Sequence, residues 1–251
     1  MYVAGKRTRK KQPQRTTRVT KPFRAPRRAV IPGLLRQTAI EKKVLFIGDA
    51  DSTNTFLPLN ATATILGLNL IQVGSSMFNR IGRKIEMRSI RLVCEMLQIP
   101  GLTRATTTVE LGRVMVVYDR QTNGAFPAIA DILQDTEQTG ANTTNSFSGI
   151  NMNNRERFVT IIDKKITVPQ GTATAGVLTN VFPNDVMLPC KWDEFRKLKG
   201  LTTHFKADSS PAVIGDIATG GLYIVSLTNL TAAGAELFQL AWNVRLKYVD
   251  A

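Results

Sequence analysis

Cysteine and histidine are almost absent from this chain of 251 residues. Its two cysteines, Cys94 and Cys190, stand 96 positions apart, and His204 is its one histidine. This inventory argues against a disulfide framework and a zinc site, and it fits a reducing compartment such as the cytosol or the nucleus. A Ser/His/Asp hydrolase would have to use His204, which we interpret instead as a half-buried strand residue.

Long apolar runs and nucleotide-binding glycine motifs are also missing. No apolar run approaches the roughly 20 residues that cross a bilayer, and the basic N-terminus is not followed by the apolar segment of a secretory signal. Neither GxxxxGK[ST] nor GxGxxG occurs. We therefore expect no membrane partner, no cofactor, no catalytic residue and no enzymatic activity.

Acidic residues that could bind a hard cation such as calcium occur as Asp49 with Asp51, as Asp185, and as Asp193 with Glu194. Isolated carboxylates in turns and loops are usually solvated, so we expect no metal site.

Acidic residues are entirely absent from the first 28 positions, which hold eleven of the 33 basic residues. The remaining 223 residues hold 22 basic against 19 acidic groups, a net charge of only +3 out of the chain's +14. The positive residues of this stretch are Lys6, Arg7, Arg9, Lys10, Lys11, Arg15, Arg18, Lys21, Arg24, Arg27 and Arg28. Four prolines by position 32 block regular structure. We predict a disordered arm over residues 1–32 and a folded domain over residues 33–251.

Such an arm suits a dense polyanion. Lysine and arginine neutralise phosphates without base selectivity, so we predict that all eleven positive residues bind nucleic acid. The cluster Lys6, Arg7, Arg9, Lys10 and Lys11 would also serve as a nuclear import signal. The alternative is a solubilising tail without a dedicated partner.

The rest of the chain has the patterns of β-strands. In 238–248, six apolar residues recur strictly at every second position, and Gln239, Asn243, Arg245 and Lys247 fall on the other parity, which predicts a strand with one buried and one wet face. Further strands are predicted at 43–47, 85–99, 109–118, 157–168 and 222–227, with weaker ones at 201–206 and 211–217. Within 85–99 the apolar parity changes between Met87 and Ile90, as a β-bulge would cause.

Short helices are predicted at 127–133 and, more weakly, at 191–197. About eight strands and almost no helix predict an all-β fold: an eight-stranded antiparallel jelly roll, that is, a two-sheet β-sandwich.

Two short motifs add a resemblance. The segment 72–90 contains Arg80, Gly82 and Ile85 in the pattern RxGxxI, and the segment 157–164, RFVTIIDK, looks like the pattern RFxVxxD, with Thr160 where that pattern has valine. These stretches resemble the single jelly-roll coat proteins of small circular, Rep-encoding single-stranded DNA viruses, of circovirus-like or geminivirus-like type, and related coat proteins of small RNA viruses and satellites. The strand after Gly221 and the final alternating strand are similar in character to the last two strands of that group.

This resemblance implies a capsid protein that assembles with itself, in about 60 copies, into a small icosahedral shell. The arm would package a genome that the resemblance suggests is single-stranded DNA, although phosphate neutralisation does not distinguish DNA from RNA. Localisation would be the virion, and the host nucleus during assembly, with host import receptors as further partners. Arg80, Arg83, Lys84 and Arg88 would extend the basic surface on the inner face of the shell, or else be ordinary surface charges.

Two other classes remain open. A cellular nucleic-acid-binding protein, ribosomal or chromatin-associated, would also use a basic tail, but such modules distribute positive charge over the folded face that meets the polyanion. A β-sandwich lectin or adhesin would predict a secretory signal and no basic arm.

Overall fold

The structure is a computed structural model, and it describes residues 42–49, 56–59, 62–98, 103–104, 111–135, 144–167, 173–174, 177–179, 191–229 and 238–250. These all belong to one of the two units into which the chain divides, Ile40–Ala251. The predicted arm over residues 1–32, with its eleven basic residues, lies outside the described residues, so its disorder remains a prediction.

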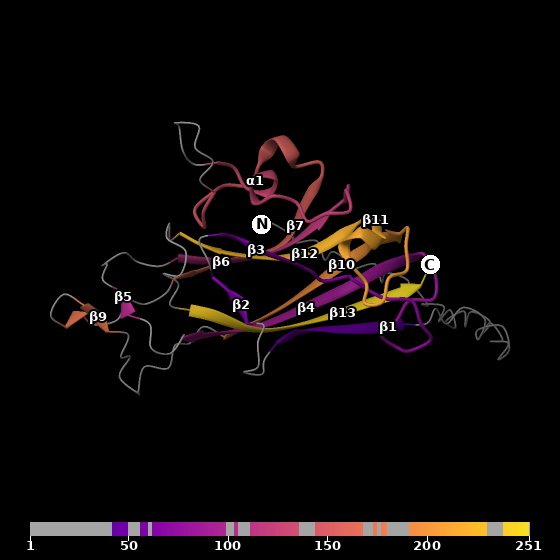
Figure 1. The fold of residues 1–251 in the computed structure, drawn as a ribbon, viewed down its shortest axis with the longest axis horizontal. Helices are drawn as coiled ribbons and strands as arrows, with labels where there is room; N and C mark the ends of the chain where they lie inside the picture. The colour runs from indigo at the N-terminus through magenta and orange to yellow at the C-terminus, as the bar shows by residue number, and fades with distance from the viewer. Residues whose placement is uncertain are drawn as a thin grey trace, which may run out of the picture. The chain divides into compact units, whose positions relative to one another are not determined.

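Two antiparallel sheets form the framework, and they lie in two layers in Figure 1. The larger sheet has the order β1 (Lys42–Asp49), β13 (Phe238–Asp250), β4 (Lys84–Gln98), β10 (Lys191–Phe205) and β11 (Ile217–Thr219), and β2 (Leu57–Pro58) also pairs with β13. The smaller sheet has the order β3 (Thr64–Gly67), β12 (Gly221–Thr228), β6 (Leu111–Asp119) and β7 (Phe158–Thr167).

The pairing of the eight principal strands in the described part of the chain is nested. The first strand pairs with the last (β1 with β13), the second with the seventh (β3 with β12), the third with the sixth (β4 with β10) and the fourth with the fifth (β6 with β7). A hairpin folded over on itself in this way is a jelly roll. The predicted fold class is therefore confirmed for the folded domain.

The remaining described elements are short. A small separate sheet contains β5 (Thr103–Arg104), β9 (Val177–Thr179) and β8 (Ala173–Thr174), and the helices are α1 (Ile129–Ile132) and the 3₁₀ turns η2 (Met152–Asn154) and η3 (Ile214–Asp216). The helix predicted over 127–133 is confirmed as α1. The helix predicted over 191–197 is wrong, because these residues form the first half of β10 and pair with β4.

The core lies between the two sheets. Leu92 and Leu246 of the larger sheet pack in one cluster with Val116 and Ile224 of the smaller one. Strand β12 is buried at every position, as its dense apolar run predicts. Burial on both faces is possible because the outer face of the smaller sheet is also covered. There, Met115 and Val225 form a second cluster with Ile132 of α1.

The larger sheet has one buried and one wet face, as the alternation in β13 predicts. Leu240, Val244 and Leu246 are fully buried, whereas Asn243 and Lys247 are exposed. The predicted bulge in β4 is confirmed. Met87 and Ser89 face consecutive residues of β13, so Arg88 is the extra residue. On the other side of β4, residues 198–200 of β10 bulge opposite Arg88.

The strand predicted at 211–217 is mostly wrong. A turn and η3 occupy this stretch, and the strand β11 begins only at Ile217. Sequence patterns also give no sign of β3, whose four residues are all half-buried and show no alternation.

The segment 157–163, which resembles the RFxVxxD motif, has a clear structural role. Arg157, just before β7, binds buried Asp119 at the end of β6 through two hydrogen bonds of 2.9 Å. Asp163 of the same motif binds buried Arg113 of β6 at 2.8 and 2.7 Å. The two ends of the motif thus join the fourth and fifth strands through paired, bidentate arginine–carboxylate contacts.

Gly220 offers a direct test of the connection between β11 and β12. Its φ is +82°, and a Cβ there would lie 2.0 Å from the Thr202 carbonyl oxygen. We expect Gly220→Ala to lower the free energy of unfolding by about 2 kcal/mol or more, measured by urea denaturation. Gly149→Ala is the control, since a Cβ at Gly149 meets nothing within 4 Å and should change stability by less than ~0.5 kcal/mol. Equal effects of the two substitutions would contradict this account.

Candidate nucleic-acid interface

The wet face of the larger sheet collects positive charge from four strands. Strand register places on this face the residues that alternate with the buried ones. These are Lys42 of β1, Arg245 and Lys247 of β13, Lys84, Glu86, Arg91 and Glu95 of β4, and Lys191, Asp193 and Lys197 of β10, joined by Arg88 at the bulge. We call this set, eight basic and three acidic residues, the basic sheet face.

The three carboxylates of the basic sheet face are all paired. Arg91 Nε donates to both carboxylate oxygens of Asp193, at 2.8 and 3.0 Å. Glu86 lies 2.9 Å from Arg88, and Glu95 lies 3.7 Å from Lys191. The hydrogen bonds from Arg91 lower the pKa of Asp193, and the positive charges of Arg91 and Arg245 act in the same direction. Asp193 therefore stays ionised and neutralises one cation of the face.

Five cations of the basic sheet face have no carboxylate within salt-bridge distance in the described part of the chain. They are Lys42, Lys84, Lys197, Arg245 and Lys247. Lys42, Lys197 and Lys247 are exposed, and Lys84 and Arg245 are half-buried. Unpaired cations gathered on one face of a sheet attract phosphates and release counterions when they bind them.

Two of the four arginine and lysine residues predicted outside the arm belong to this face, namely Lys84 and Arg88. A third, Arg83, is exposed just before β4 begins. These placements allow contact with a polyanion.

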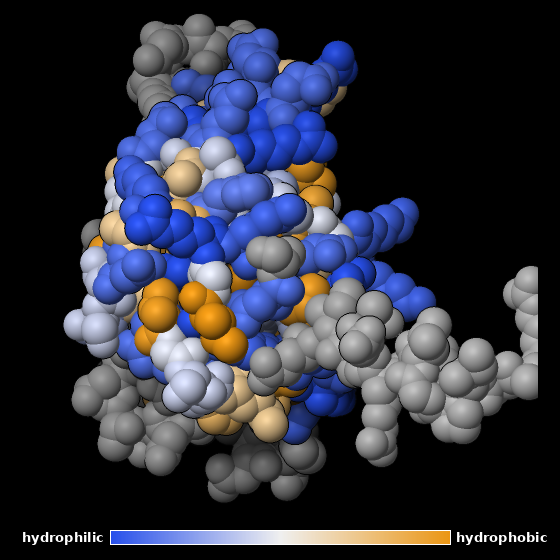
Figure 2. All heavy atoms as spheres, turned by 90° about the vertical axis from the view of Figure 1, so that its right-hand side faces the viewer, coloured by the Kyte–Doolittle hydropathy of each residue, from blue (hydrophilic) through white to orange (hydrophobic). Residues whose placement is uncertain are grey.

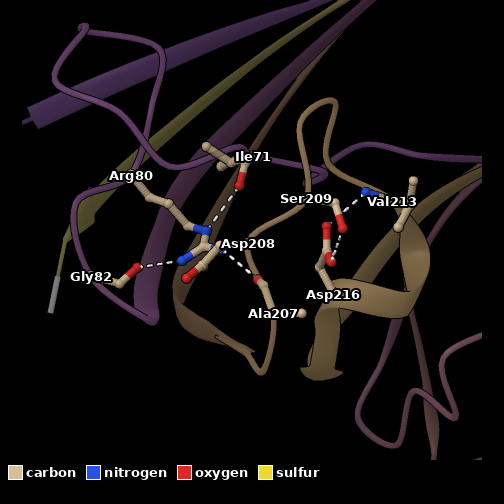
Figure 3. A network of polar contacts seen from close by, with 8 residues as sticks. All are labelled: Ile71, Arg80, Gly82, Ala207, Asp208, Ser209, Val213 and Asp216. Carbon is tan, nitrogen blue, oxygen red and sulfur yellow. Dashed lines mark hydrogen bonds and ion pairs between the residues drawn. The ribbon is translucent and has the colours of Figure 1, made fainter.

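Arg80 occupies a different environment, shown in Figure 3. Its side chain is 1% exposed. Nε donates to the Ile71 carbonyl at 2.9 Å, Nη1 to the Gly82 carbonyl at 2.7 Å, and Nη2 to the Ala207 carbonyl at 2.9 Å and to Asp208 Oδ1 at 2.6 Å. The guanidinium also stacks 3.9 Å from the centre of the Phe205 ring.

Arg80 is thus a structural residue, and its prediction as a nucleic-acid ligand is corrected. Its bonds join the β3–β4 connection (68–83) to the β10–β11 connection (206–216). The second connection is itself braced, because Asp216 accepts hydrogen bonds from Ser209 Oγ at 2.8 Å and from the Val213 amide at 2.9 Å (Figure 3). Four of the five N–H donors of Arg80 bind groups of the protein, and the buried side chain presents no accessible surface to a phosphate.

Those of the other sequence candidates that the structure describes do not converge on a reaction centre. His204 lies in β10, as predicted for a strand residue, but it is exposed rather than half-buried. Asp193 and Glu194 project from opposite faces of β10. Asp193 binds Arg91, and Glu194 binds Lys164 of β7 and Arg196. Asp51, Asp185 and Cys190, and the side chain of Asp49, lie outside the described residues.

Within the described ranges, no group of three or more histidine, cysteine or carboxylate side chains is placed to hold a metal ion. The same part of the chain contains no helix of the length and apolar character that crossing a membrane requires. Cys94 is buried, and burial raises the pKa of its thiol to about 12, so the thiol is unreactive at neutral pH.

The surface seen in Figure 2, from the end of the molecule where the C-terminus lies in Figure 1, is largely hydrophilic, with hydrophobic side chains in small groups. No protein-family model matches the chain, and no curated protein matches it. The site must therefore be interpreted from its own chemistry.

Sequence reasoning missed most of the basic sheet face. Arg245 and Lys247 had a usable signal, because both fall on the polar parity of the final strand. Lys197 had none, because its segment resembled a helix. Lys42 stands one residue outside the predicted first strand.

Arg80 and its neighbour Arg83 form a matched pair for mutation. We expect Arg80→Ala to lower the free energy of unfolding by about 3 kcal/mol, because it leaves buried carbonyl groups without their donor. Arg83→Ala removes an exposed side chain and should change stability by less than ~0.5 kcal/mol. Urea unfolding of both variants measures this. Equal stability of the two variants would argue against a structural role for Arg80.

The unpaired cations can be tested by salt dependence. Lys197→Gln and Lys247→Gln should each reduce the slope of log K against log [salt] for oligonucleotide binding to the full chain by ~0.7 to 0.9. Lys165→Gln, at an exposed lysine of β7 in the smaller sheet, is the matched control and should leave the slope unchanged. If the control changes the slope as much as the other two, the attraction is not specific to the basic sheet face.

Proposed function

We propose that this protein is a viral capsid protein: a jelly roll that assembles with copies of itself into a small icosahedral shell and packages nucleic acid. The observation that carries the proposal is the combination of the nested eight-strand pairing with a basic sheet face. Strand β1, which the basic N-terminal sequence precedes, lies at the edge of that same sheet. Positive charge from the arm and from the sheet would then act on one polyanion.

The arm is the main electrostatic component of the proposal. Eleven positive charges per chain in about 60 copies give on the order of 660 charges, enough to neutralise several hundred phosphates of an enclosed genome. The resemblance to coat proteins of small circular DNA viruses makes single-stranded DNA the proposed cargo. The cluster at Lys6–Lys11 would direct the chain to the host nucleus through import receptors, and the mature location would be the virion.

The proposal also covers catalysis. A shell subunit needs a rigid body, surfaces for its neighbours and a means of holding the genome, and none of these requires a reaction centre. We propose on this basis that the protein is not an enzyme.

A cellular nucleic-acid-binding protein with a basic tail is the second candidate, and one observation favours it. The net charge outside the N-terminal stretch is close to zero, but this charge is not evenly distributed over the folded domain. Eight basic and three acidic residues on the basic sheet face leave a local excess of +5. A folded face of this kind is what such modules present to a polyanion. Assembly into a closed shell separates the two candidates.

Electron microscopy of the purified full-length protein tests assembly and packaging together. We expect closed particles of roughly 15 to 25 nm that retain nucleic acid after nuclease treatment. A variant lacking residues 1–30 should keep a cooperative unfolding transition but lose the retained nucleic acid, because most of its phosphate-binding charge is gone.

Two results would overturn the proposal. A stable monomer or dimer at every salt concentration would favour the cellular candidate, and full packaging without residues 1–30 would remove the arm from its role.

A further inference from the structure

An unusual row of side chains crosses the basic sheet face. The strand register pairs Phe46 of β1 with Arg245 of β13, Arg245 with Arg91 of β4, and Arg91 with Phe195 of β10. Directly paired residues in antiparallel strands project from the same face of a sheet. The row therefore reads Phe–Arg–Arg–Phe, with an aromatic ring at each end.

Both rings are exposed to solvent. Phe46 is 54% exposed and Phe195 is 49% exposed, whereas Leu45 and Ile47, the neighbours of Phe46 in sequence, pack against the core. In the described part of the chain, neither ring takes part in an aromatic pair or a cation–π contact. A single exposed aromatic residue needs no explanation. Two in register across four strands, with arginines between them, form a composite surface.

The adjacent row supplies further charge. There the register pairs Val44 with Lys247, Lys247 with Ser89, and Ser89 with Lys197. Two exposed lysines thus lie beside the Phe–Arg–Arg–Phe row, and neither has a carboxylate partner in the described ranges. Cations beside flat, accessible rings are the two components of a surface that binds single-stranded nucleic acid: phosphates contact the cations, and unpaired bases stack on the rings.

We propose that the basic sheet face binds single-stranded nucleic acid, with bases stacked on Phe46 and Phe195 and phosphates held by Arg245, Lys247 and Lys197. The inference rests on the proposed function in taking a single-stranded nucleic acid as the cargo, and it adds the surface of the fold that would select single strands over duplexes. A duplex keeps its bases stacked inside, so it can use only the cations of this face.

The spacing of the rings fits separate bases. Strands β1 and β10 are three inter-strand steps apart, so the two phenylalanines stand roughly 14 Å from each other. Adjacent bases in a duplex rise only ~3.4 Å. Each ring would then stack on a separate base, and the nucleic-acid backbone between those two bases would pass over Arg245 and Arg91.

A second copy of the chain is a poorer occupant. Two such faces meeting each other would bring two surfaces with a local excess of +5 together, and like charges in contact disfavour the complex. A polyanion supplies the complementary charge, and aromatic stacking supplies a contact that an acidic protein surface would lack.

The test compares single strands with duplexes at matched sequence. A fluorescent mixed-sequence DNA oligonucleotide, alone or annealed to its complement, is titrated with the full-length chain and with the double variant Phe46→Ala/Phe195→Ala over a series of salt concentrations. We expect the double variant to lose roughly 10- to 100-fold in affinity for the single strand. Its salt slope should be unchanged because no charge is removed, and its affinity for the duplex should also be unchanged.

Phe147→Ala is the matched control, because Phe147 is 61% exposed and lies in the β6–β7 connection, away from the larger sheet. It should leave both affinities unchanged. As an independent readout, photo-crosslinking of a bromodeoxyuridine-substituted oligonucleotide to the wild-type chain should place the modified peptides at Phe46 and Phe195.

Four results would overturn the inference. Two concern affinity: the double variant loses equal affinity for single strand and duplex, or it loses no more affinity than Phe147→Ala does. The third is that the crosslinks are confined to other peptides. The fourth is a double variant that fails to assemble while its affinity for single strands stays that of the wild type. The last would identify the face as a contact between copies. Particle assembly and packaging by the wild type test the proposed function separately, so either idea can fail while the other stands.

Discussion

The strict two-residue alternation along β13 is the constraint on which the rest of the structure depends. This strand pairs with β1 on one side and with β4 on the other over almost its whole length. Its buried parity supplies Val244 and Leu246 to the core, and its other parity supplies Arg245 and Lys247 to the basic sheet face. A register slip of one residue would exchange the two sets and place lysine and arginine in the core. The same hydrophobic energy that fixes the fold therefore also fixes the positions of the cations.

The bulge in β4 keeps this register intact. Beyond Arg88 the apolar parity of β4 changes, and without the extra residue either Met87 or Ile90 would face water. Strand β10 follows with its own bulge at 198–200, where Lys199 and Gly200 have φ values of 49° and 80°. The bulged residue itself, Arg88, lies 46% exposed beside Glu86. One local irregularity thus preserves burial on the inner face and leaves an arginine on the outer face.

Sequence reasoning succeeded for the strands in which burial of apolar side chains alone decides the residue pattern. In β13 and β12 burial decides the pattern, so both strands and the phase change in β4 could be predicted. It failed in the first half of β10, because Glu194 and Arg196 occupy positions of inward parity. There the sheet edge is open enough for Glu194 to bind Lys164 of β7, and ion pairs replace the apolar contacts that alternation detects. It failed for Arg80 for a related reason: the carbonyl groups that bury this arginine come from Ile71 and Ala207, which no local pattern connects.

The two outer faces of the sandwich differ in a way that bears on function. The smaller sheet buries Met115 and Val225 under α1, so its outer face is committed to internal packing. The larger sheet carries no comparable apolar cluster on its outer face among the described residues. Polar and charged side chains occupy most of that face, and Phe46 and Phe195 are exposed among them. Residues 29–41 connect Arg28, the last of the eleven basic residues of the predicted arm, to β1, and 13 residues span at most about 47 Å. Under the proposed function, a polyanion bound at Arg28 would therefore be tethered within reach of the folded domain. Its contact with the basic sheet face would then be an intramolecular step with an effective concentration of the order of millimolar. The proposed phosphate binding by the arm and the proposed stacking surface on the sheet would in this way combine into firm retention of a single strand, without either contact having to be tight by itself.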